Sequence, residues 1–137
     1  MRALLAIPLT ILIVAAYNFM AFQNLAGLEA AAVTTTLMSG ATVVITWGDG
    51  LVAVGLLVLF IEMLKAARVG SATILDHGLS MLVFIAALVE FVLVREAGTA
   101  TFALIVALCL IDVVAGFSVS IRTAHRDVSV GRGSGFY

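Results

Sequence analysis

The sequence predicts an all-α integral membrane protein, a four-transmembrane-helix bundle with a short extracytoplasmic β-hairpin between helices one and two. Three observations lead to this fold class. The 137 residues are 64% hydrophobic and only 11% charged, whereas soluble domains are about 25% charged. Four long apolar runs divide the chain, and a bilayer crossing needs about 20 helical residues. Basic residues gather at alternate ends of these runs.

The positions of the basic residues predict the orientation. Arg95 alone lies on the outer side, and the other six Lys and Arg residues lie at inner ends, at Arg2, Lys65, Arg68, Arg122, Arg126 and Arg132. Positively charged loops stay on the cytoplasmic side of a membrane. We therefore expect both termini in the cytoplasm, and the membrane to be a bacterial inner membrane.

A single membrane domain accounts for residues 1–137. The predicted transmembrane segments are residues 3–22, 49–66, 72–94 and 99–121, with an outer loop at 23–48 and a cytoplasmic tail at 122–137. Pro8 predicts a mild kink or an early helix start. The Gly/Ser/Arg-rich tail is expected to be flexible unless a partner orders it. Alternatively, the first run is a signal peptide cleaved near Val14–Ala16.

The first outer loop predicts the hairpin. β-Branched residues dominate Val33–Met38 and Ala41–Trp47, and Ser39-Gly40 lies between them. Glycine allows the positive φ that tight hairpin turns need. The alternative is that Ala41–Trp47 forms the upper part of a long second helix. Asp49 is expected to be the N-cap of that helix.

Contact surfaces are predicted on the hairpin and on the fourth helix. Open strand edges invite pairing, and small residues four apart allow helices to approach closely. Trp47 suits the membrane interface. The interface candidates are Val33, Thr35, Leu37, Val43, Ile45, Trp47, Gly116 and Ser120.

Polar residues inside the apolar runs are costly in a bilayer and mark candidate sites. Asp112 lies near the middle of the fourth run, with no basic residue at its depth. Helical spacing puts acidic residues and a hydroxyl on one face of the third helix. The candidates for a polar core or an ion pathway are Asp112, Asp76, His77, Ser80, Glu90 and Asn18.

Each of these candidates also has a structural explanation. Asp112 can form a hydrogen bond between helices, and the face of the third helix can serve close packing through its small residues. His77 can lie hydrogen-bonded at the interface, and Tyr17 is expected to be an interfacial anchor. Glu62 and Lys65 are three apart and are expected to pair at the cytoplasmic surface.

The sequence predicts no catalytic residue, metal or cofactor. Cys109 is the single cysteine, and there is no phosphate-binding loop, nucleophile elbow or zinc motif. A net charge of −1 offers no basic field for nucleic acid. The expected partners are the lipid bilayer and other membrane subunits or further copies of the chain.

Three functions are considered, and the third, an enzyme acting on a lipid substrate, is set aside because the sequence offers no nucleophile–base pair. The leading interpretation is an accessory or assembly subunit of a membrane complex, or a homo-oligomer, with the hairpin as its contact. The alternative is a proton- or cation-coupled channel or transporter that uses Asp112 with the stripe of Asp76, Ser80 and Glu90. An acid in mid-membrane favours this alternative.

Overall fold

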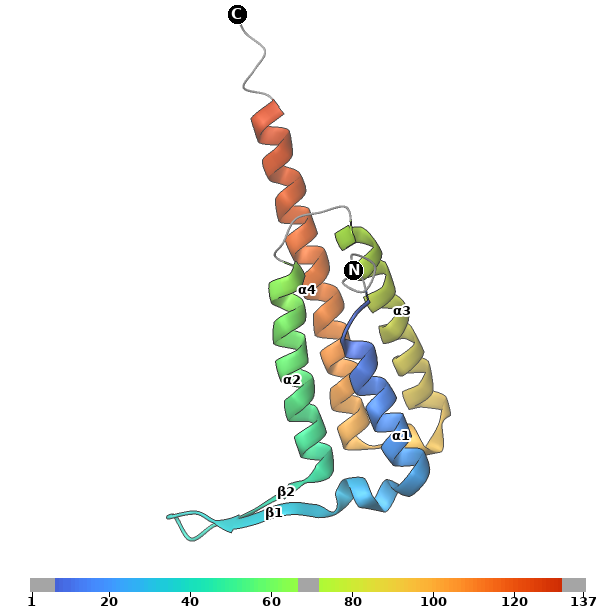
Figure 1. The fold of residues 1–137 in the computed structure, drawn as a ribbon, viewed down its shortest axis with the longest axis vertical. Coiled ribbons are helices and arrows are strands. Elements are labelled where there is room, and N and C mark those ends of the chain that lie inside the picture. Colours follow the sequence, from blue (N-terminus) through green and yellow to red (C-terminus); the bar gives the residue numbers. More distant parts are fainter. Residues whose placement is uncertain (1–6, 67–71, 132–137) are drawn as a thin grey trace, which may run out of the picture.

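The chain folds as a helical bundle with a β-hairpin at one end. The structure is a computed structural model that describes residues 7–66 and 72–131, with side chains described over 7–65 and 77–118. Its elements are α1 (Thr10–Glu29), β1 (Ala31–Thr36), β2 (Thr42–Thr46), α2 (Trp47–Ala66), α3 (Ala72–Leu93), the 3₁₀ turn η2 (Arg95–Ala97) and α4 (Ala100–Gly131). The helices run side by side, and the hairpin projects sideways from their lower end (Figure 1). The predicted helices and hairpin are therefore confirmed within the described ranges.

The bundle exposes apolar surface along most of its length. By length and composition, Thr10–Glu29, Trp47–Lys65 and Ala100–Ser118 could each cross a membrane, and His77–Leu93 is a shorter apolar helix. Large apolar side chains such as Phe19, Leu57 and Leu93 lie exposed on these helices. Soluble monomers rarely expose contiguous apolar patches of this extent. This surface is consistent with a location in a membrane.

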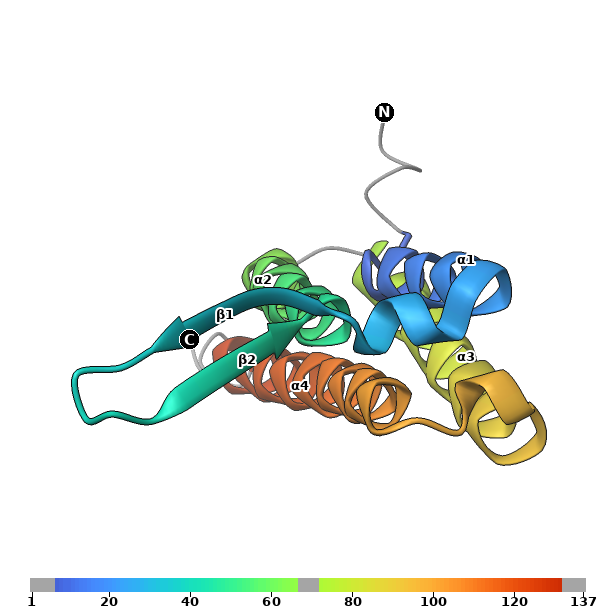
Figure 2. The ribbon, with the colours of Figure 1, turned by 90° about the horizontal axis from the view of Figure 1, so that it is seen from below.

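Helix α1 begins and ends later than the sequence predicted, at Thr10 and Glu29 rather than at residues 3 and 22. Pro8 lies just before it, and the Pro8 carbonyl accepts a hydrogen bond from the N–H of Ile11 at 3.2 Å. Proline suits a helix start because the first N–H groups have no partner within the helix. Near its other end Asn24 is extended (φ −160°, ψ 88°), and the last turn runs across the end of the bundle (Figure 2).

The hairpin forms where the sequence predicted it. β1 pairs with β2 in antiparallel register, with Val33 opposite Ile45 and Thr35 opposite Val43. Gly40 closes the turn at φ 84°, a left-handed conformation that side chains with a Cβ rarely adopt. The alternative of a second helix starting at residue 41 is wrong, because Thr42–Thr46 is strand and α2 starts at Trp47.

The start of α2 corrects one expectation. Asp49 is not the N-cap, since it lies in the first turn of a helix that begins at Trp47. The hydroxyl of Thr46 accepts the N–H of Asp49 at 3.1 Å, and the Asp49 carboxylate accepts the Thr46 N–H at 2.9 Å. This reciprocal pair is a capping box. It joins the end of β2 rigidly to the start of α2.

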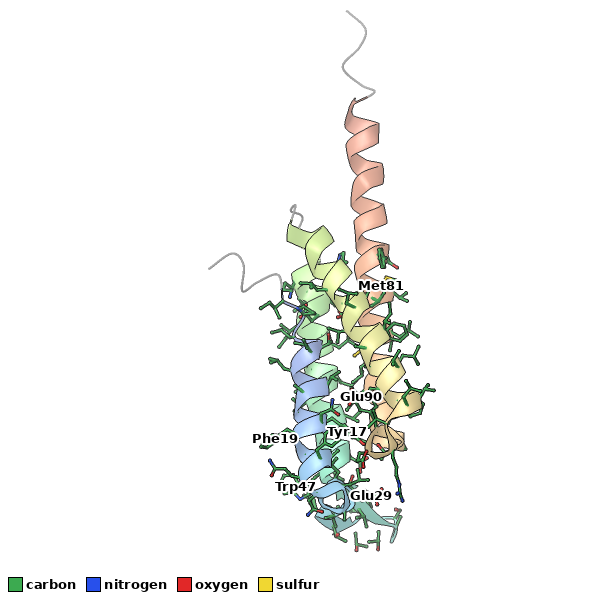
Figure 3. The ribbon with its side chains drawn as sticks, turned by 90° about the vertical axis from the view of Figure 1, so that its right-hand side faces the viewer. Tyr17, Phe19, Glu29, Trp47, Met81 and Glu90 are labelled. Carbon is green, nitrogen blue, oxygen red and sulfur yellow. The ribbon has the colours of Figure 1, made fainter. Side chains whose placement is uncertain are left out.

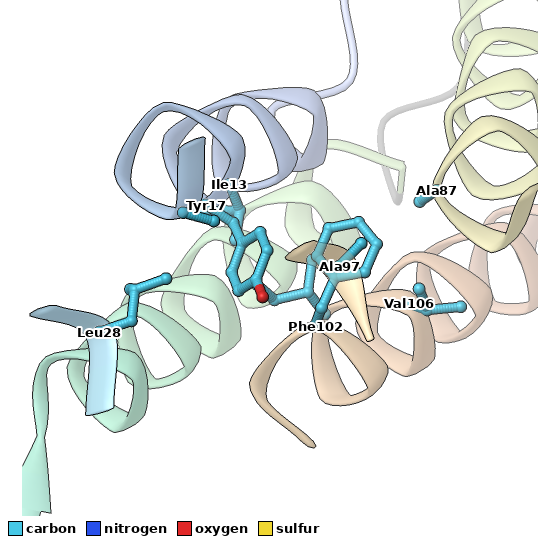
Figure 4. Close-up of a cluster of buried hydrophobic side chains, with 9 residues drawn as sticks. Ile13, Tyr17, Leu28, Ala87, Ala97, Phe102 and Val106 are labelled. Carbon is cyan, nitrogen blue, oxygen red and sulfur yellow. The ribbon is translucent and has the colours of Figure 1, made fainter. Parts of the chain in front are cut away.

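The core lies where α1, α3 and α4 meet near the hairpin end of the bundle. Tyr17 and Phe102 pack with ring centroids 4.6 Å apart, in a buried cluster that also contains Ile13, Ala97 and Val106 (Figure 4). Tyr17 is fully buried. The expectation of an interfacial anchor at this position is therefore wrong.

Helix α4 extends further than the sequence predicted, to Gly131 rather than residue 121. Its final part projects beyond the ends of α2 and α3 (Figure 1). The first ten residues of the expected flexible tail, 122–131, are therefore helical. Residues 132–137, Arg2 and Arg68 lie outside the described part of the chain.

Candidate functional site

A cavity of about 230 Å³ opens at the hairpin end of the bundle. It lies between the last turns of α1, the first turn of α2 and the start of α4. Figure 3 shows Tyr17, Glu29 and Trp47 in the lower part of the molecule. The polar part of its lining consists of Tyr17, Glu29, Thr46, Asp49, Thr99 and Thr101.

Tyr17 fixes one wall of this cavity. Its hydroxyl donates to the carbonyl of Glu96 at 2.9 Å and lies 2.6 Å from the hydroxyl of Thr99. Thr99 in turn accepts the N–H of Phe102 at 3.1 Å, so it caps α4. One buried phenol thus connects α1 to the turn between α3 and α4.

The lining of the cavity combines carboxylates and hydroxyls. It contains two carboxylates, Glu29 and Asp49, and no Lys, Arg or His. Such groups accept hydrogen bonds from polar or positively charged molecules. In residues 7–66 and 72–131, no group of three or more His, Cys, Asp or Glu side chains could hold a metal ion.

Asp112 lies at the opposite half of the bundle, in a buried position. Its side chain is 7% exposed, and its Oδ2 accepts a hydrogen bond from the hydroxyl of Thr10 at 3.2 Å. This contact joins α4 to the first turn of α1. It is the kind of interhelical hydrogen bond that the structural explanation of Asp112 expects.

His77 is buried between α3 and α4. Only 6% of its surface is exposed, and its Nε2 has no hydrogen-bond partner among the described residues. Its ring packs directly against Gly116, where an added Cβ would lie 2.4 Å from the His77 Nδ1. Gly116 therefore serves a contact within the chain, whereas the side chain of Ser120 lies outside the described region.

The other pathway candidates do not gather at the cavity. Ser80 is buried in α3, and Glu90 lies ten residues further along that helix, about 15 Å away at 1.5 Å per residue. Glu90 and Asn18 are half-buried, and the side chain of Asp76 is not described. None of the five candidates whose side chains are described lines the cavity.

The hairpin candidates lie at the surface. Val33, Leu37, Ile45 and Trp47 are exposed, as is Thr35, and Val43 is half-buried. Apart from the half-buried Val43, packing within the described chain leaves these side chains open. They remain available for contact with lipid or with another protein.

A contact that the sequence did not predict joins α1 and α2. It is built on the predicted pair of Glu62 and Lys65, which forms with Lys65 Nζ 2.8 Å from the Glu62 carboxylate. Glu62 is also buried, and it accepts the N–H of Leu9, while Lys65 donates to the Ile7 carbonyl at 3.2 Å.

The sequence did not predict the role of Thr10, or that Glu62 is buried and accepts the N–H of Leu9. The signal available for both was a polar side chain inside an apolar run, which needs a partner when it lies in a membrane.

Comparison with protein-family models, curated proteins and solved structures finds no match to the chain.

Proposed function

We propose that the chain acts by association in a membrane, as an accessory or assembly subunit of a complex or as a homo-oligomer, with the hairpin as its extracytoplasmic contact. The observation that carries this proposal is the exposure of the hairpin. Every residue of β1 is exposed, and the hairpin stands out from the bundle (Figure 2).

The physical chemistry of the hairpin supports the same conclusion. An isolated two-stranded hairpin is only marginally stable in water, and its outer edges present unpaired backbone groups. Natural proteins usually blunt such edges with charged residues. The segment 30–47 holds no Asp, Glu, Lys, Arg or His, so both edges suit pairing with another chain.

The test is mass photometry of the full chain in mild detergent. We expect particles of more than one copy or with a co-purifying subunit. Thr34→Lys places a charge in the middle of β1 and should shift these particles to the monomer, whereas Ser39→Lys in the turn is the matched control. A monodisperse monomer without co-purifying protein would overturn the proposal.

A proton- or cation-coupled channel or transporter is the second candidate. It is favoured by two buried polar groups, Asp112 and the His77 Nε2 without a partner in the described residues. Reconstituted vesicles with an imposed pH or ion gradient test it. Flux that Asp112→Asn abolishes would support it, and the absence of flux would exclude it.

A further inference from the structure

The register of the hairpin sorts its side chains onto two faces. Residues directly opposite in an antiparallel pair share a face, and successive residues alternate between faces. The pairs Val33–Ile45 and Thr35–Val43 lie on one face, which we name the apolar face. The pairs Thr34–Val44 and Thr36–Thr42 lie on the other, the threonine face.

The apolar face is largely uncovered in the described part of the chain, with Thr35 exposed and Val43 half-buried. Val33 is 53% exposed and Ile45 is 41% exposed, and Leu37, two residues beyond Thr35, continues the same side of β1 to the turn. Three of the four side chains of this face are aliphatic, whereas three of the four on the opposite face are threonines. A hairpin surrounded by water would gain no free energy from this separation of aliphatic and threonine side chains onto opposite faces.

The hairpin, and with it the apolar face, lies at one end of the helices. The hairpin leaves the bundle where α1 ends and α2 begins, and it runs crosswise to the helices and outward beyond them (Figures 1 and 2). If the helices cross a bilayer, the hairpin lies along the surface of that leaflet. Trp47 at its base is exposed, and tryptophan is enriched at this interface.

We propose that the apolar face is a lipid-binding surface, seated in the interfacial region of the leaflet at which α1 ends and α2 begins. The threonine face then points to water. Elements with one apolar and one polar face bind in the interface plane. The uncharged segment 30–47 avoids the cost of bringing a charge into the apolar region.

A lipid occupant accounts for these observations better than a protein occupant. The face carries aliphatic groups and one threonine hydroxyl, with no charged or aromatic side chain of the kind that anchors most protein interfaces. The lipid contact is independent of the association proposed above, because it uses one face of the hairpin and leaves both strand edges open.

The experiment is a spin-label accessibility scan on the full chain. Single cysteines replace Val33, Val43 and Ile45 on the apolar face and Thr34, Thr36 and Thr42 on the threonine face, in a Cys109→Ala background. The labelled proteins are reconstituted at low density into phosphatidylcholine vesicles. Collision with oxygen, which partitions into lipid, is compared with collision with a water-soluble nickel chelate.

We expect the oxygen-to-nickel collision ratio to be several-fold higher on the apolar face, alternating with a period of two residues. Leu57→Cys on α2, where the native side chain is 65% exposed, provides the lipid standard. A correct value there also shows that the background protein is inserted and folded.

Two results would overturn the proposal. Equal and high nickel accessibility on both faces would put the hairpin in water. Low collision with both reagents on the apolar face, with spin–spin broadening as label density rises, would identify a second copy of the chain as its cover. Association measured by mass photometry can succeed or fail separately from either result.

Discussion

Tyr17 shows how one side chain can tie several elements together. Its ring packs on Phe102 and its hydroxyl contacts Glu96 and Thr99. Tyr17→Phe keeps the ring and leaves the carbonyl oxygen of Glu96 without this donor. We expect a loss of about 1–3 kcal/mol in unfolding free energy, measured by detergent-induced unfolding followed by circular dichroism. Phe19→Leu, at an exposed position on the same helix, is the control and should change little.

Gly116 is a second position where a single atom matters. An alanine Cβ would lie 2.4 Å from the Nδ1 of His77, so the ring must move or the helices must separate. We expect Gly116→Ala to cost about 1–3 kcal/mol, as overpacking does in other cores.

A double-mutant cycle isolates this contact. In a His77→Ala background the space beside Gly116 is open, and Gly116→Ala should then cost much less than it does alone. Equal costs in both backgrounds would show that the glycine is needed for another reason.

The contacts of single residues could be predicted from the sequence only in part. An acid in the middle of an apolar run marks Asp112 as a group that needs a partner, since an unpartnered acid is costly in a bilayer. Its partner Thr10 could not be predicted, because the hydrogen bond depends on how closely α1 approaches α4. The same holds for the Tyr17 hydroxyl, whose acceptor is a backbone oxygen of a turn far along the chain.

Among the elements, the hairpin was the most predictable. A high density of β-branched residues and a Ser-Gly turn are local signals, and no distant contact is needed to place them. The first residue of α2 was harder to predict, because Thr46 and Asp49 both favour a helix start. Only the backbone decides which of them is the cap. The extension of α4 was missed because Gly and Ser in the tail outweighed the helix-forming Arg122, Ala124 and Arg126.

The turn of the hairpin gives a prediction at this scale. Gly40 holds φ 84°, which a β-branched residue adopts only with strain. Gly40→Val should therefore destabilise the pairing of β1 with β2 and leave the helices intact. In Gly40→Val, the amides of the hairpin should exchange their hydrogens faster. The control Ser39→Ala should leave this exchange unchanged. Unchanged exchange in Gly40→Val would contradict this account.

For the whole molecule, polar contacts at its two ends hold the helices together. Tyr17 and Thr99 act at the hairpin end, and Glu62 with Lys65 joins α2 to the residues before α1 at the other. Hydrogen bonds to charged groups are worth about 1.5–3 kcal/mol each. We expect Glu62→Gln to lower the unfolding free energy by about 2 kcal/mol.

A control separates this effect from the loss of any surface charge. Glu96→Gln removes an acid whose side chain has no hydrogen bond or ion pair in the described structure, and it should leave stability nearly unchanged. If the two variants lose the same free energy in detergent-induced unfolding, the contact between Glu62 and the start of α1 does not stabilise the bundle.

The charged residues at the two ends of α2 have a consequence for the bilayer itself. Asp49 and Glu62 are 13 residues apart (62 − 49), which is about 20 Å along a helix. The hydrocarbon core of a typical bilayer is about 30 Å thick. Glu62 is buried and faces the residues before α1 rather than lipid. A bilayer that α2 crosses therefore either becomes thinner around the helix or encloses this ion pair, with the long Lys65 side chain reaching toward the headgroups. In the first case, hydrophobic mismatch would favour thin regions of membrane.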